Sequence, residues 1–128
     1  MGQRYLIDSN VIIDYTTNIL PAKISEFLEQ IFNTDFLISA IVKIEVLGFN
    51  DEPSKLQGLE EFLNAASILH IDDRVIQQTI ILRRKYKIKL GDAIIAATAI
   101  LNELTLITRN TADFKNINGL QTINPWDL

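Results

Sequence analysis

Short apolar runs alternate with longer stretches of helical periodicity along the chain, and this alternation constrains the fold more than any other feature. In the longer stretches, apolar residues recur every three or four positions, which is typical of helices that bury one face. Strands separated by helices predict an α/β sandwich with a mostly parallel sheet. We expect strands at residues 4–7, 35–38, 67–71, 104–108 and about 121–123.

The helical stretches begin at residues that commonly start helices. Pro21 suits the start of a second helix, Ser39 is an expected N-cap, and Asp72-Asp73 are expected to cap a later helix. Gly91 interrupts the pattern and Asp92 is expected to restart it, in a helix that runs to about Asn102. Two further helices are expected, one directly after Asp8-Ser9-Asn10 and one that uses Leu56, Leu59, Phe62 and Leu63.

Length and composition limit the class of protein. The chain has 128 residues, of which 48% are apolar, so we expect one globular domain over residues 1–128. The longest near-apolar stretch, residues 93–101, is too short to cross a bilayer. The N-terminus passes straight into a strand without a visible signal peptide. We therefore expect a cytoplasmic protein.

The chain lacks the residues that most metal and nucleophile chemistry requires. It has no cysteine, which excludes thiolate sites, and one histidine, His70, which cannot form a multi-histidine zinc site. The expected role of His70 is structural, in or beside a strand. Any metal would therefore be bound by oxygen ligands, which favours Mg²⁺ or Mn²⁺.

Four acidic residues stand at the ends of predicted strands or inside apolar helical runs. Asp8 closes the run Tyr5-Leu6-Ile7, and Asp113 follows the strand at 104–108 within one short loop. In parallel α/β sheets, ligands bind beyond the carboxyl ends of the strands. Glu45 and Asp92 belong to predicted helices, and convergence of all four would create a divalent metal site for an enzyme that acts on phosphates.

Each acid also has a structural interpretation. Asp8 and Asp92 are natural N-caps, and Asp113 suits an ordinary loop. Glu45 is harder to explain in this way, because its apolar neighbours predict a helix with little solvated surface. If these acids form no common site, four separate structural explanations must all be correct at once.

Four segments resemble the motifs of PIN domains, the fold of VapC-type toxin ribonucleases of type II toxin–antitoxin systems. The resemblance follows the order of the family's motifs and spans nearly the whole chain. One such motif would be a weak signal, whereas four in register are strong. The segments are Leu6-Ile7-Asp8-Ser9-Asn10-Val11-Ile12-Ile13-Asp14, Ile41-Val42-Lys43-Ile44-Glu45-Val46, Leu90-Gly91-Asp92-Ala93-Ile94-Ile95-Ala96 and Leu106-Ile107-Thr108-Arg109-Asn110-Thr111-Ala112-Asp113-Phe114.

The resemblance implies a three-layer α/β/α PIN-like sandwich with about five strands. It also implies a homodimer that a small cognate antitoxin neutralises. Asp14 matches a frequent acid of the family but is left outside the catalytic set. The implied catalytic and metal-binding residues are Asp8, Glu45, Asp92 and Asp113, and the implied secondary polar pocket is formed by Asn10, Thr108 and Asn110.

This constellation predicts metal-dependent phosphodiester hydrolysis with metal-activated water. The resemblance implies that the enzyme is an endoribonuclease, which hydrolyses RNA. The net charge of −4 argues against a nonspecific nucleic-acid binder, but the basic residues cluster. Tyr86, within that cluster, could add a stacking surface for bases. Basic residues also suit the C-terminus of a helix. The candidate RNA-phosphate contacts are Arg83, Arg84, Lys85, Lys87 and Lys89.

Other functions stay open at this point. A phosphoreceiver domain has similar length, but the paired acids expected after its first strand are missing, because Ser9 follows Asp8. A haloacid-dehalogenase-type phosphatase needs Asp-x-Asp there, and a dinucleotide-binding domain needs a glycine-rich turn. A catalytically inactive PIN-fold binding protein and a DNA-cleaving enzyme remain as further alternatives. Trp126 is expected to pack the C-terminal tail against the body of the domain.

Overall fold

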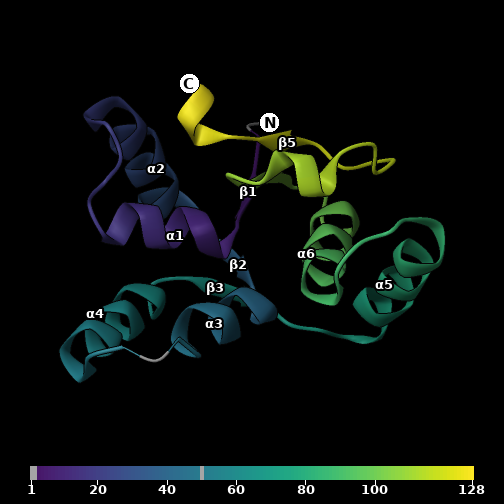
Figure 1. The fold of residues 1–128 in the computed structure, drawn as a ribbon, viewed down its shortest axis with the longest axis horizontal. Coiled ribbons are helices and arrows are strands. Elements are labelled where there is room, and N and C mark those ends of the chain that lie inside the picture. The colour runs from purple at the N-terminus through teal and green to yellow at the C-terminus, as the bar shows by residue number, and fades with distance from the viewer. Residues whose placement is uncertain (1–2, 50) are drawn as a thin grey trace.

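The computed structural model describes residues 3–49 and 51–128 and contains short strands surrounded by helices (Figure 1). The helices α1 and α2 lie on one side of the strands in this view, and α5 and α6 lie on the other. In chain order the elements are β1 (Tyr5–Ile7), α1 (Ser9–Thr16), α2 (Ala22–Thr34), β2 (Leu37–Ser39), α3 (Ala40–Leu47), α4 (Pro53–Leu63), β3 (Ser67–Leu69), α5 (Asp73–Lys85), α6 (Leu90–Leu101), β4 (Thr105–Ile107), the 3₁₀ turn η1 (Thr111–Phe114), β5 (Thr122–Ile123) and the 3₁₀ turn η2 (Pro125–Asp127).

The strands form two parallel ladders. One ladder has the order β1-β4-β5 and the other pairs β2 with β3. Strand β1 also contacts β2, so the two ladders are neighbours. The predicted mostly parallel α/β architecture with about five strands is therefore confirmed, and the hydrogen bonding divides it into three strands and two.

The core consists of aliphatic side chains from both ladders and the helices beside them. Leu6, Ile38 and Leu106 are fully buried in the strands. Helix α6 is buried at every position from 93 to 99, because it contacts α3, α5, β2 and β4. Its small residues, such as Ala96 and Ala97, allow these elements to approach closely. No helix within the described residues is long and apolar enough to span a membrane.

Local capping agrees with most of the predicted helix starts. Asp8, Ser39 and Asp72 each accept a hydrogen bond from a backbone N–H in the first turn of the helix that follows. Pro21 directly precedes α2. These caps fix α1 and α3 at the carboxyl ends of β1 and β2, and thus determine where Asp8 and Glu45 lie.

The predicted start of α6 is wrong. The helix begins at Leu90 with Lys89 as its N-cap, so Gly91 and Asp92 belong to its first turn. Gly91 lies where α3 approaches closely, because a methyl group added there would be 3.6 Å from Glu45 Oε2 and 3.9 Å from an Ile41 side-chain carbon. These are ordinary van der Waals distances, so the site would accept a methyl group, and Gly91 continues the helix rather than interrupting it.

Candidate functional site at the carboxyl ends of β1 and β4

The register of β1 and β4 makes Asp8 a neighbour of Thr108. Ile7 pairs with Ile107, and the Asp8 N–H donates to the Ile107 carbonyl at 2.9 Å. The Thr108 hydroxyl donates to Asp8 Oδ2 at 2.8 Å. Asp8 is 4% exposed and Thr108 is fully buried, so this contact takes place away from solvent. The sheet itself therefore builds the centre of the candidate site.

Asp8 also caps α1, as the structural interpretation of the sequence proposed. The Ser9 N–H donates to Oδ1 at 2.7 Å, and the Asn10 amide donates to Oδ2 at 3.3 Å. A carboxylate has about four lone-pair sites, and the longest contact to Asp8, from the Ser9 hydroxyl to Oδ1 at 3.4 Å, is the weak one that a cation would replace. Capping and ligand binding are therefore compatible at Asp8.

Glu45 lies on α3 and is exposed, which contradicts the prediction that it has little solvated surface. The reason is that α3 buries only Val42 and Val46, while Ile44 is 62% exposed. The apolar residues beside Glu45 thus do not enclose it. Its carboxylate reaches toward Gly91 at the start of α6, which brings it to the same edge of the sheet as Asp8.

Asp92 stands in the first turn of α6 and is partly buried. It is not an N-cap, because Lys89 occupies that position and the cap makes no side-chain hydrogen bond. The structural explanation that the sequence offered for Asp92 therefore fails. A carboxylate that does not cap its helix remains available for another partner.

The carboxylates influence each other's ionisation. Although the Glu45 side chain as a whole is exposed, its carboxylate is partly desolvated by neighbouring atoms, which raises its pKa above the usual value. The negative charges of Asp8 and Asp92 raise it further, while hydrogen bonding with Ser9 lowers it in part. Partial burial likewise raises the pKa of Asp92, followed by the charges of Asp8 and Asp113, and Lys89 acts in the opposite direction. The four predicted acids thus share one negative electrostatic environment.

The polar pocket residues lie around Asp8 and Thr108 to different degrees. Asn10 contacts both, with its amide nitrogen 3.3 Å from Asp8 Oδ2 and 3.4 Å from Thr108 Oγ1. The backbone N–H of Asn110 donates to Thr108 Oγ1 at 3.1 Å. Asn110 and Asp113 are exposed, and Asp113 lies in η1. Asn10 and Thr108 therefore belong to the centre of the cluster, and Asn110 and Asp113 to its rim.

The donor set suits a hydrated divalent cation rather than a closed cage. Within residues 3–49 and 51–128, no group of three or more Asp, Glu or His side chains is arranged to hold a metal ion as it stands. Mg²⁺, however, is usually bound by one or two carboxylates and retains several waters. An open cluster of mutually repelling carboxylates around the buried Asp8 fits such an ion by its chemistry, because positive charge relieves the repulsion.

The basic segment lies next to the acidic cluster. Arg83, Arg84 and Lys85 form the last turn of α5, and Arg83 Nη1 donates to the Ile88 carbonyl at 2.9 Å. The Tyr86 hydroxyl accepts the Asn118 N–H at 3.0 Å and its ring is partly buried. Tyr86 thus tethers a loop, whereas the basic side chains of this segment are exposed, and Lys89 is the one that acts on Asp92.

A second polar group lies beside the cluster, at Asp14, which sequence reasoning named but left outside the catalytic set and without a partner. Asp14 is 3% exposed and pairs with Arg109, whose Nη1 lies 2.8 Å from Oδ1. Ser9 was not singled out, although it contacts Asp8 and influences Glu45. The available signal for Asp14 was its place on α1 among the buried residues Val11 and Ile12, since a carboxylate on a buried helix face requires a partner.

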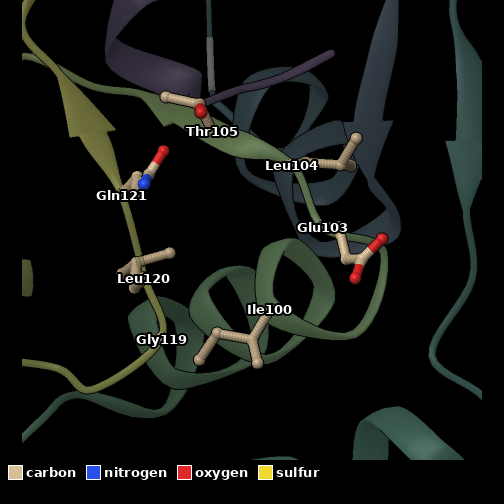
Figure 2. Close-up of a pocket in the computed structure, with 7 residues that line it drawn as sticks. All are labelled: Ile100, Glu103, Leu104, Thr105, Gly119, Leu120 and Gln121. Atoms are coloured by element: carbon tan, nitrogen blue, oxygen red, sulfur yellow. The ribbon is translucent and has the colours of Figure 1, made fainter. Parts of the chain in front are cut away.

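A pocket lies away from these carboxylates. It has a volume of about 540 Å³ and lies at the amino end of β4, opposite the end that leads to Thr108. Figure 2 shows the residues that line it. Glu103 is the charged side chain that lines it, beside Thr105 and apolar residues. Because the carboxylates gather at the other end of the strand, their convergence identifies the candidate site better than the size of this cavity.

The match to a known family extends over residues 5–120, for which the PIN domain model matches. The chain belongs to the PIN domain family. This confirms the resemblance on which the sequence prediction relied. No curated protein sequence matches the chain.

Solved structures agree with this assignment over the whole length. The chain is similar to a toxin–antitoxin complex from Klebsiella pneumoniae, with 32% identity over 97% of this chain and 99% of that chain and a TM-score of 0.79. FitAcB from Neisseria gonorrhoeae is 26% identical over 97% and 99%, with a TM-score of 0.76. DNA-bound VapBC from Salmonella typhimurium, at 23% identity over 97% and 99% with a TM-score of 0.81, shares the fold.

Glu45→Gln is expected to stabilise the metal-free chain at neutral pH. The raised pKa of Glu45 means that the folded state opposes its charge, so the wild type loses stability as pH rises through that pKa. The melting temperature of the variant should exceed that of the wild type at pH 7.5, by an amount limited by solvent screening of the exposed side chain. The gain should vanish in acid, below the ordinary glutamate pKa, where Glu45 is protonated in both states.

Glu60→Gln is the matched control, because Glu60 is an exposed glutamate near the C-terminal end of another helix, α4. The Glu60→Gln variant removes the same charge at a position outside the cluster of Asp8, Glu45, Asp92 and Asp113. The melting temperature of this variant should therefore stay near the wild-type value. An equal gain in both variants would show that overall charge, not the cluster, causes the effect.

Proposed function

We propose that this chain is a metal-dependent endoribonuclease, a VapC-like toxin that hydrolyses RNA phosphodiester bonds. The observation that carries the proposal is the shared field of Asp8, Glu45, Asp92 and Asp113 at the carboxyl edge of a parallel sheet, in a member of the PIN domain family. A related fold occurs in the toxin–antitoxin complex from Klebsiella pneumoniae, which supports the same class. Clustered carboxylates without a usable histidine or cysteine suit phosphoryl chemistry with a hydrated cation.

In this proposal, Asp8 is the central ligand of Mg²⁺ or Mn²⁺. Thr108 and Asn10 hold its carboxylate, so one oxygen is fixed and the other faces Ser9. Glu45 and Asp92 approach from α3 and α6 and would complete the acidic side, with Asp113 at the rim. When bound, the cation would activate water and stabilise charge on the attacked phosphate.

The protonation state of these acids decides whether they can serve as ligands. Carboxylates bind metal in their ionised form, and the raised pKa values of Glu45 and Asp92 favour the protonated form at mildly acidic pH. Protons and cations would therefore compete for the same oxygens. The proposed activity should fall as pH drops toward the pKa values of these two groups.

Asp8→Asn and Asp92→Asn are expected to reduce RNA cleavage by about 10²–10³-fold, the usual cost of losing a group that stabilises transition-state charge. The measurement is the cleavage rate of a mixed RNA substrate during a Mg²⁺ or Mn²⁺ titration, with circular dichroism to verify folding. Asp127→Asn, which removes an exposed carboxylate of η2, should cleave like the wild type. A folded Asp92→Asn variant with the wild-type rate would contradict the assignment.

We further propose that the basic segment, Arg83, Arg84, Lys85, Lys87 and Lys89, contacts RNA phosphates. Its five charged side chains are exposed, and Lys89 is close enough to Asp92 to lower the pKa of that acid. Substrate held here would place a phosphate near the carboxylates. Arg84 and Lys87 are the clearest candidates, since Arg83 already bonds to the Ile88 carbonyl.

Charge reversal at two of these positions should change the salt dependence of RNA binding. For the Arg84→Glu/Lys87→Glu variant, the slope of log affinity against log salt should become shallower by about 1–1.5. The Lys23→Glu/Lys55→Glu variant applies the same charge change on α2 and α4, away from the site, and should keep more of the wild-type slope. Equal slopes in both variants would favour a purely structural role for the basic segment.

A small antitoxin and a second copy of the chain are the proposed protein partners. The antitoxin partner is supported by the toxin–antitoxin complex from Klebsiella pneumoniae, which shares this fold. For the homodimer, we propose the outer face of α5, where Ile76, Ile80 and Ile81 are 44%, 38% and 52% exposed. Several exposed isoleucines on one helix are typical of an interface.

Ile80→Lys is expected to convert the proposed dimer into a monomer, because a buried, unpaired charge opposes association. Sedimentation equilibrium at micromolar concentration measures the mass. Ile19→Lys, at a position 55% exposed beyond α1, serves as the control and should leave the dimer intact. A wild-type monomer, or a dimer that persists in Ile80→Lys, would contradict this interface.

A further inference from the structure

A buried carboxylate outside the acidic cluster binds the C-terminal segment. Asp14 of α1 receives two contacts from Arg109 Nη1, at 2.8 Å to Oδ1 and 3.1 Å to Oδ2. Trp126 donates its Nε1–H to Oδ2 at 3.1 Å. A carboxylate that is 3% exposed requires such partners, so Asp14 joins α1, Arg109 and the C-terminal segment at one point.

The backbone at Arg109 leads directly to Asp8. Its N–H donates to Asn10 Oδ1 at 3.0 Å, and the amide nitrogen of Asn10 donates to Asp8 Oδ2 at 3.3 Å. The preceding residue, Thr108, donates to the same oxygen at 2.8 Å. The position of the backbone at 108–109 therefore determines both side-chain contacts to Asp8 Oδ2.

The C-terminal segment holds this backbone from the other side. Asn124 donates its side-chain amide to the Arg109 carbonyl at 3.3 Å, and its Oδ1 accepts the Trp126 N–H at 3.0 Å. The Thr108 N–H donates to the Ile123 carbonyl at 3.0 Å. Residues 123–126 thus fix the backbone at 108–109 directly and, through Asp14, fix the Arg109 side chain. This segment lies beyond residue 120, where the match to the PIN domain model ends.

We propose that Asp14 and Trp126 are positioning residues that orient Asp8 for cation binding. The chain of contacts runs from Trp126 to Asp14 and Arg109, and from the Arg109 backbone to Asn10 and Asp8. Outer partners of this kind fix the orientation of a metal ligand and tune its affinity. The role of the cation rests on the proposed function, whereas the orientation of Asp8 does not.

Two conservative variants interrupt the chain of contacts. Trp126→Phe retains an aromatic ring and removes the Nε1–H donor, and Asp14→Asn retains size and removes the charge. The Ser9 amide reports on Asp8, because it donates to Oδ1 at 2.7 Å. In the metal-free chain, both variants should shift the Ser9 amide resonance in a ¹⁵N–¹H NMR spectrum. Their Mn²⁺ dissociation constants, measured by calorimetry, should rise by about tenfold.

Tyr86→Phe is the matched control. It removes the hydroxyl that accepts the Asn118 N–H at 3.0 Å, and so releases a loop that has no contact with Asp8. The Ser9 resonance and the Mn²⁺ affinity of Tyr86→Phe should equal those of the wild type. This should hold even if Tyr86→Phe lowers the melting temperature as much as Trp126→Phe does. Equal effects of the three variants would reveal general loosening and would overturn the proposal.

The two readouts separate this inference from the proposed function. A wild-type chain that binds no Mn²⁺ would refute the metal-dependent function, and the Ser9 resonance would then decide on the positioning of Asp8 by itself. If the wild type binds Mn²⁺ and the Trp126→Phe and Asp14→Asn variants retain its affinity, the inference is wrong while the function stands. An unchanged Ser9 resonance in both variants would also overturn it.

Discussion

The parallel pairing of β1 with β4 is the contact on which the candidate site depends. Because Ile7 pairs with Ile107, the next residues along each strand are Asp8 and Thr108, and their side chains meet at the carboxyl edge. A shift of one residue in this register would turn one of the two side chains to the other face of the sheet. Asp8 would then lose the hydroxyl donor that makes its burial tolerable.

The acids around Asp8 repel one another electrostatically, and the rest of the fold holds them close together despite this repulsion. Glu45 and Asp92 have raised pKa values because partial burial and neighbouring negative charges oppose their ionisation. Helices α3 and α6 still bring them together, because the helices are anchored by buried residues such as Val42 and Ile95. Carboxylates held close in this way are a common sign of a functional site. The same repulsion is what a divalent cation would relieve.

The sequence predicted some parts of this site well and others poorly. The strand ends that carry Asp8 and Thr108, and the cap at Ser39, follow from local apolar runs and polar side chains, and the structure agrees. The burial of Glu45 was predicted wrongly, because the apolar residues around it do not all face the core. Asp92 was assigned to a helix start that the structure places at Leu90. A glycine beside a helix crossing looks the same in sequence as a glycine that interrupts a helix.

The α/β class, the family and the residues from which an acidic site can be built are all readable from the sequence, since they follow from periodicity and from motifs within single segments. Only the tertiary structure decided which of these residues touch. Asp14 and Arg109 are 95 positions apart, and Asp8 and Thr108 are 100 apart. Such contacts depend on strand register and helix packing, which arise from the burial of the whole core and not from local preference. The bond from Trp126 to Asp14 is likewise a product of the assembled fold.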